Sequence, residues 1–202
     1  MSPARALPAQ SIDPQARLQD VIRSFVARYN YLHEWRVQKL VFYADLLSLS
    51  RRGYRLTSAA FTKHFYGVFS SDIREALRSM ADLTRRPDKT PTGRDTVRYQ
   101  FQGSLHVPTL SKEDIILIEE AHQATRDIPN EQLADWGKET TLWRTTDQGA
   151  VLDIQRYATL TGRDSRTDVE RYLALRAKTE TRRARFKSVK ELRRALQKPS
   201  SE

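Results

Sequence analysis

The sequence contains no cysteine, only four histidines and only seven glycines among its 202 residues. The absence of cysteine excludes disulfide bonds, thiolate nucleophiles, thiolate zinc sites and iron–sulfur clusters. A metal ion would therefore need histidine and carboxylate ligands alone. The scarcity of glycine also leaves few places for a loop that wraps closely around a phosphate group.

The four histidines are too far apart in the sequence to form a recognisable metal or catalytic motif. They follow one another at intervals of 31, 42 and 16 residues, so no pair has the spacing that places two imidazoles on one face of a helix. A Gly-x-Ser-x-Gly nucleophile motif is also absent. The sequence therefore predicts a protein that is not an enzyme and that uses no metal, cofactor or small-molecule substrate. The histidines are His33, His64, His106 and His122.

Long apolar runs are missing as well. No stretch approaches the roughly 20 apolar residues that span a bilayer, and the first ten residues lack the apolar run of a secretory signal. Hydrophobic residues nevertheless make up 39% of the chain, which is enough to fill a core. We expect a cytoplasmic globular protein without membrane contact.

The positive charge is concentrated near the C-terminus. The formal net charge is +10, and residues 163–198 hold 13 lysines and arginines against five acidic residues. The remaining residues therefore carry a net charge of only about +2. A basic overall composition does not by itself indicate that the core binds nucleic acid.

Periodic apolar residues and N-cap signals predict a series of helices. Asp13-Pro14 is a favourable helix start, and the following apolar residues have the spacing of an amphipathic helix. Apolar residues then occupy nearly every face of the next helix, which should be buried on most sides and end at Gly53. We expect helices at 14–33, at 35–50, from Ser70 or Ser71 to about Pro87, and after Ser111, Asn130 and Asp147.

Only one part of the sequence indicates β-structure. Residues 87–96 form a turn-rich loop, after which Val97, Tyr99 and Phe101 alternate with polar residues. Leu105 and Val107 could pair with this strand. The predicted fold is mainly α, a compact helical domain with a small β-strand or hairpin insertion at about 97–107 and a basic helical C-terminal tail.

Two segments carry the most specific signal. The buried helix contains the run Lys39-Leu40-Val41-Phe42-Tyr43-Ala44, and Tyr66-Gly67-Val68 follows after a turn. These segments resemble the Panacea domain of SocA-like antitoxins, in which the second motif commonly ends in proline instead of valine. Three later motifs fit the same family in order and spacing, so the resemblance covers roughly residues 16–146. They are Leu110–Asp114, Asn130–Asp135 and Lys138–Trp143, where Leu142 replaces a proline.

The resemblance implies a mostly helical domain at 14–162 and leaves the basic extension at 163–202 outside the family pattern. It also implies a protein-binding module of a bacterial or phage toxin–antitoxin system, which neutralises a toxin encoded beside it by direct binding. One relative instead delivers its toxin to a protease, so a role as a proteolytic adaptor is an alternative. Neither role requires catalysis.

Lys39 and Asp45 are charged residues on an otherwise apolar helix. Six residues apart, they lie on different faces of the helix, so we expect no direct pair between them. Either Lys39 extends to the surface and Asp45 accepts a hydrogen bond from a neighbouring helix, or both line a polar groove with Tyr43 and Tyr66. The predicted partner-binding residues are Lys39, Tyr43, Asp45, Tyr66, Phe69, Trp143, Leu192 and Leu196.

The basic tail allows a second hypothesis, in which the protein binds nucleic acid or regulates its own operon through phosphate contacts. No base-reading motif accompanies the cations, and a solvated tail that binds nothing explains them equally well. The candidate residues for DNA contact are Arg182, Arg183, Arg185, Lys187, Lys190, Arg193 and Arg194.

Overall fold

The fold is a mixture of α-helices and β-strands, so the prediction of a mainly α fold is wrong. The computed structural model describes residues 12–90, 93 and 95–154. Five strands form two antiparallel sheets, one with the order β1-β5-β4 and one that pairs β2 with β3. In chain order the elements are α1 (Pro14–Val26), β1 (Leu32–His33), α2 (Glu34–Arg52), β2 (Thr62–His64), β3 (Gly67–Phe69), α3 (Ser71–Ser79), β4 (Leu83–Lys89), β5 (Asp95–Phe101), α4 (Lys112–Thr125), α5 (Asn130–Glu139) and α6 (Thr141–Arg144).

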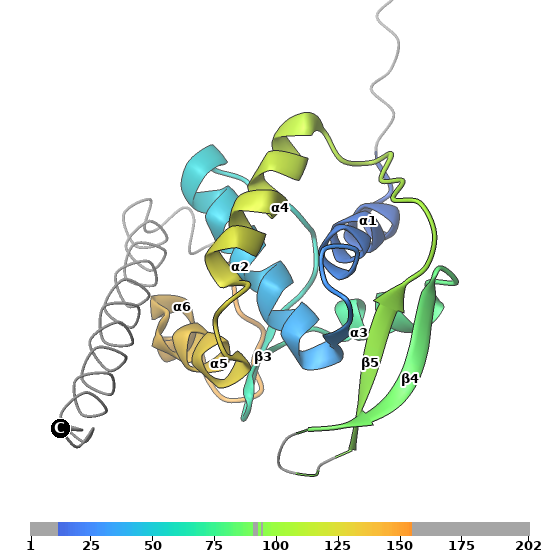
Figure 1. The fold of residues 1–202 in the computed structure, drawn as a ribbon. Helices are drawn as coiled ribbons and strands as arrows, with labels where there is room; N and C mark the ends of the chain where they lie inside the picture. Colours follow the sequence, from blue (N-terminus) through green and yellow to red (C-terminus); the bar gives the residue numbers. More distant parts are fainter. Residues whose placement is uncertain (1–11, 91–92, 94, 155–202) are drawn as a thin grey trace, which may run out of the picture.

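Helix α2 lies at the centre of the fold, as the sequence predicts. Every residue from Arg36 to Leu49 is buried. Figure 1 shows α4 crossing α2, α1 on one side of it, and α5 with α6 on the other. The helix ends at Gly53, whose φ of 74° is the left-handed conformation that glycine adopts at low cost.

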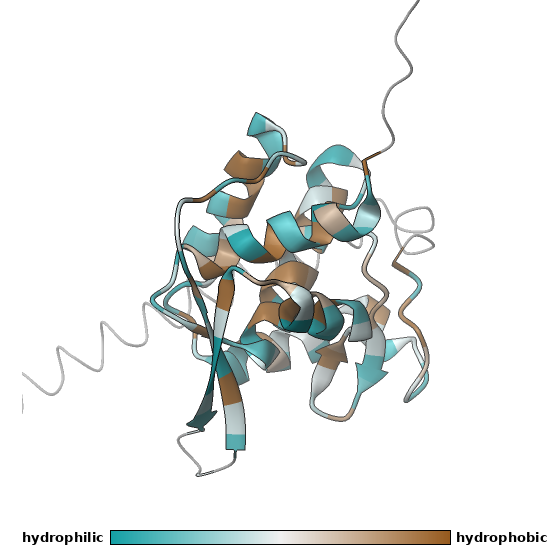
Figure 2. Ribbon diagram, turned by 90° about the vertical axis from the view of Figure 1, so that its right-hand side faces the viewer, coloured by the Kyte–Doolittle hydropathy of each residue, from teal (hydrophilic) through white to brown (hydrophobic). Residues whose placement is uncertain are grey.

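Strand β4 is the largest departure from the predicted elements. Helix α3 begins after the N-cap Ser70 as expected but ends at Ser79, and residues 83–89 form a strand instead of extending the helix toward Pro87. This strand pairs with β5 from Leu83↔Phe101 to Lys89↔Asp95. Charged residues and a proline are typical of an exposed edge strand, so the local sequence gives no sign of the pairing with β5. Figure 2 shows that the outer end of this hairpin is hydrophilic.

Three further boundaries differ from the predictions. Helix α1 ends at Val26 because the chain then turns to place β1 beside β5. Strand β5 ends at Phe101, so residues 103–107 do not extend it. Residues 147–153 are not helical, since Gly149, Ala150 and Leu152 exchange backbone hydrogen bonds with Phe61 and Lys63. The rest of the helix predicted after Asp147 lies outside the described residues.

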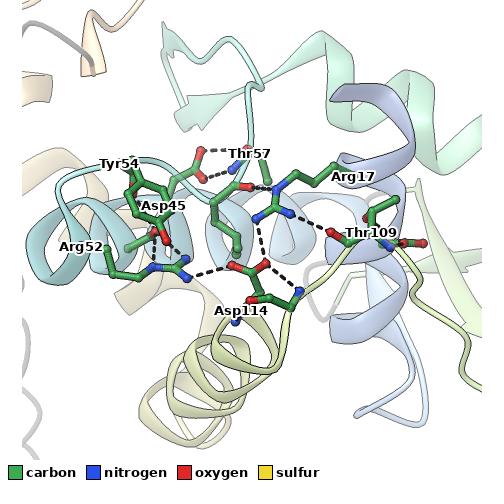
Figure 3. A network of polar contacts seen from close by, with 11 residues as sticks. Arg17, Asp45, Arg52, Tyr54, Thr57, Thr109 and Asp114 are labelled. Atoms are coloured by element: carbon green, nitrogen blue, oxygen red, sulfur yellow. Dashed lines mark hydrogen bonds and ion pairs between the residues drawn. The ribbon is translucent and has the colours of Figure 1, made fainter. Parts of the chain in front are cut away.

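A buried ion-pair network ties three helices together (Figure 3). The Asp114 carboxylate of α4 accepts hydrogen bonds from Arg17 of α1 at 2.9 Å and from Arg52 of α2 at 2.8 Å. Arg17 also donates to the backbone oxygens of Leu56 and Thr109. Asp114 in addition forms a capping box with Ser111, after which the sequence predicts a helix. Burial alone would raise the pKa of Asp114, but the Ser111 amide and the two guanidinium groups lower it below its usual value.

No helix within the described part of the chain is both long enough and apolar enough to cross a bilayer.

Replacing Asp114 with asparagine should lower the free energy of unfolding by roughly 3 kcal/mol, because two half-buried guanidinium groups would lose the buried carboxylate that they share. Glu120→Gln is the control, since its exposed pair with Arg51 should contribute at most about 1 kcal/mol. Urea denaturation measures both effects. A lowered folded-state pKa stabilises the fold above the ordinary value of 3.8, so the effect of Asp114→Asn should shrink as the pH falls below it. An equal effect of both substitutions at neutral pH would contradict this role.

Candidate protein interface

The most exposed apolar side chains near the family motifs lie at the tip of the β2–β3 hairpin. We call residues Thr62–Phe69 the aromatic hairpin. Its strands pair from Thr62↔Phe69 to His64↔Gly67, which leaves Phe65 and Tyr66 as a two-residue turn. These side chains are 73% and 63% exposed, and their rings meet edge to face at 5.1 Å. Exposed aromatic side chains of this kind are frequent centres of protein interfaces.

Helix α2 holds one edge of the aromatic hairpin. The buried Lys39 ammonium donates a hydrogen bond to the backbone oxygen of Val68. The neighbouring Gln38 side chain donates to Ser70 O at 2.9 Å and accepts from Ser70 N at 2.8 Å. Two consecutive residues of the central helix therefore fix the end of β3 and the start of α3.

The other edge of the hairpin is held by the chain that follows α6. The Lys63 ammonium donates to the backbone oxygens of Trp143 at 2.9 Å and Thr146 at 2.7 Å, and it lies 5.2 Å from the Trp143 ring centroid. Backbone hydrogen bonds from Gly149 and Leu152 extend the sheet beyond β2. The exposed tip is thus carried by a hairpin that is anchored on both sides.

The predicted aromatic residues differ in exposure. Tyr43 is 1% exposed and packs edge to face on Trp136 at 5.1 Å. Trp143 is buried, and Phe69 is half-buried beneath the Arg74 guanidinium at 4.6 Å. Among the six predicted partner-binding residues that the structure describes, Tyr66 alone is more than half exposed. Sequence reasoning missed Phe65, which precedes Tyr66 in the same turn.

Asp45 does not lie near the aromatic tip. Its carboxylate is fully buried and accepts hydrogen bonds from Arg55 Nη2 at 2.7 Å, Thr57 N at 2.7 Å and Thr57 Oγ1 at 2.9 Å. Burial raises the pKa of this carboxyl group, and the Arg55 and Thr57 donors oppose the shift. Figure 3 shows Asp45 and Thr57 linking α2 to the loop that follows it. The structure therefore does not gather Lys39, Tyr43, Asp45 and Tyr66 around one groove, and Asp45 anchors a loop.

Lys39 is an unusual buried cation. It is 7% exposed, and no carboxylate of the described residues forms an ion pair with it. Burial and the nearby Lys138 ammonium lower the pKa of Lys39 from 10.5 to about 8. A shift of this size corresponds to roughly 3 kcal/mol of unfavourable free energy for the charged form. A buried charge of this cost, on the central helix and in contact with the aromatic hairpin, marks Lys39 as a candidate functional residue.

The described residues offer no candidate metal site beside this interface. In residues 12–90, 93 and 95–154, no three histidine or acidic side chains are grouped so that they could hold a metal ion.

The tail residues predicted to bind a toxin or nucleic acid lie outside the described part of the chain, and their roles stay predictions. They are Leu192 and Leu196 for the toxin, and Arg182, Arg183, Arg185, Lys187, Lys190, Arg193 and Arg194 for nucleic acid.

One comparison with known proteins bears on this region. The model of the family described as antitoxin SocA-like, Panacea domain, matches residues 37–144, which run from α2 to the end of α6 and include the aromatic hairpin. Neither a curated protein nor a solved structure matches the chain.

Replacing Lys39 with methionine should stabilise the isolated protein at pH 7. Removing the buried charge relieves roughly 3 kcal/mol, and leaving Val68 O without its donor costs about 1 to 2 kcal/mol, so a net gain of roughly 1 to 2 kcal/mol is expected. Between pH 8 and 10.5 the unfolded chain binds more protons at Lys39 than the folded protein does. Wild-type stability should therefore rise with pH in that window, and the variant should lack this rise.

Urea denaturation at pH 7 and pH 10 measures both effects, and Lys112→Met serves as the control because Lys112 is an exposed lysine. A wild-type protein whose stability is flat between these pH values would show that Lys39 titrates normally.

Proposed function

The chain belongs to the SocA-like antitoxin family with a Panacea domain, and on this premise we propose that it neutralises a cognate toxin by direct binding through the aromatic hairpin. The toxin is the protein encoded beside it, and the two proteins meet in the cytoplasm, where both are made. The observation that carries the proposal is the exposure of Phe65 and Tyr66 on a hairpin that the rest of the fold anchors.

Exposed aromatic rings cost solubility, so their position on a rigid support indicates a partner. Tyrosine and other aromatic side chains dominate binding energy when they insert into a pocket of the partner and lose contact with water. The Phe65 and Tyr66 rings already contact each other, and the Tyr66 ring lies 6.0 Å from that of His64. A preformed tip of this kind loses little conformational entropy when it binds.

Steric occlusion is sufficient for neutralisation. A hairpin tip of two aromatic residues can enter a cleft of the toxin and exclude its substrate, and such a mechanism needs no catalytic group on the antitoxin. The family membership supports a binding role, and the anchored hairpin supports this surface as the point of contact.

The double substitution Phe65→Ala and Tyr66→Ala should abolish protection from the toxin without unfolding the protein. Both side chains are largely exposed, so the melting temperature should change little, whereas losing two aromatic anchors should weaken the complex by roughly 4 kcal/mol or more. Titration calorimetry with the neighbouring gene product measures affinity, and co-expression growth assays measure protection.

Tyr54→Ala is the matched control, because Tyr54 is an aromatic residue with 54% exposure that lies outside the hairpin, beyond the end of α2. This variant should bind the toxin as the wild type does. The proposal fails if the hairpin variant protects cells fully, or if the wild-type protein does not bind the neighbouring gene product.

A further inference from the structure

Lys39 has fewer hydrogen-bond partners than the other buried charges of the described fold and than the half-buried Lys63. Arg36 donates to four oxygens at the α4–α5 connection, and Lys63 donates to two backbone oxygens. Asp45 accepts from Arg55 and twice from Thr57. Lys39 has three N–H groups, and within the described part of the chain it donates only to Val68 O. Two N–H groups of this buried ammonium therefore have no acceptor among residues 12–90, 93 and 95–154.

The place of Lys39 connects it to the aromatic tip. Gly67 follows Tyr66 directly, and a Cβ atom at position 67 would lie 3.1 Å from Lys39 Nζ and 3.2 Å from its Cε. The ammonium group thus occupies the space of a side chain at the base of the tip. Ala134 of α5 borders the same space, because the Cβ atom of Ala134 lies 3.8 Å from the place that a Cβ atom at position 67 would occupy. Only glycine at position 67, with its φ of 113°, allows this approach.

The electrostatic surroundings of Lys39 favour an anion. The charged group that acts on it most strongly is Lys138, which repels it. A neutral side chain would fill the same space without the cost of a buried charge, so packing does not explain the lysine. A carboxylate supplied from outside would pair with the charge and accept the remaining N–H groups.

We propose that Lys39 is the receptor for a carboxylate that the toxin presents at the base of the aromatic hairpin, an inference that rests on the proposed function. Phe65 and Tyr66 then bind an apolar surface of the toxin, while Lys39 binds an aspartate, glutamate or C-terminal carboxylate beside that surface. This pair adds specificity, because a toxin without the carboxylate leaves the buried ammonium unpaired.

The first experiment uses acetate as the probe and needs neither the toxin nor a variant. Nitrogen-15 NMR of the lysine ammonium groups follows Lys39 as acetate, phosphate or chloride is added at matched ionic strength. Acetate should move the Lys39 signal and raise its pKa above about 8, chloride should not, and the signal of Lys138 should move little. A Lys39 signal that ignores acetate, or that responds more strongly to phosphate, overturns the inference.

The second experiment measures toxin affinity for the wild type, Lys39→Met and the control Lys138→Met. Losing the buried pair should weaken binding by about thirtyfold or more, and the control should change it only slightly. The carboxylate raises the pKa of Lys39 in the complex, so wild-type affinity should be full below pH 8 and fall as the pH rises through that higher pKa. Lys39→Met should lack this dependence.

The two experiments separate the two claims. Equal affinities and pH profiles for Lys39→Met and the wild type overturn the inference while leaving the proposed function in place. A wild-type protein that does not bind the neighbouring gene product contradicts the proposed function, and the acetate titration then decides alone whether Lys39 receives carboxylates.

Discussion

The burial of α2 on all sides is the constraint on which the rest of the structure depends. A helix with apolar side chains on every face must be covered by other elements, and those elements need fixed positions. The polar side chains of α2 fix them, because they reach from the helix to several of its neighbours. Arg36 binds the α4–α5 connection, Gln38 the start of α3, Lys39 strand β3, Asp45 and Ser48 the loop after α2, and Arg52 helix α4.

This arrangement explains how a small hairpin can serve as a rigid binding element. A two-stranded hairpin is marginally stable alone in water, so its shape must come from the surrounding fold. Lys39 holds β3 from the centre of the protein, and Lys63 holds β2 against the end of α6. The aromatic tip can therefore present two hydrophobic rings to a partner without first becoming ordered. The same contact leaves the charge of Lys39 beside the tip, which is the position that our proposal requires for pairing with a carboxylate of the partner.

Local signals in the sequence predicted some of this structure and could not predict the rest. The buried helix, its glycine cap and the helix that begins after Ser111 depend on neighbouring residues, and the structure confirms them. Strand β4 depends on pairing with β5, and its charged residues and proline give no local strand signal, so the sequence predicts the end of a helix followed by a loop there. The family motifs identified Lys39 and Tyr66, but the exposure of Phe65 and the loop contacts of Asp45 follow from long-range packing.

Hydrogen–deuterium exchange of the protein with and without the neighbouring gene product tests the central claim most directly. If the aromatic hairpin is the contact surface, the amides of residues 64–69 should become strongly protected in the complex. Those of residues 54–57, which the Asp45 contacts already hold in the free protein, should change little. Protection confined to other parts of the chain, with the hairpin amides exchanging as in the free protein, would contradict the account.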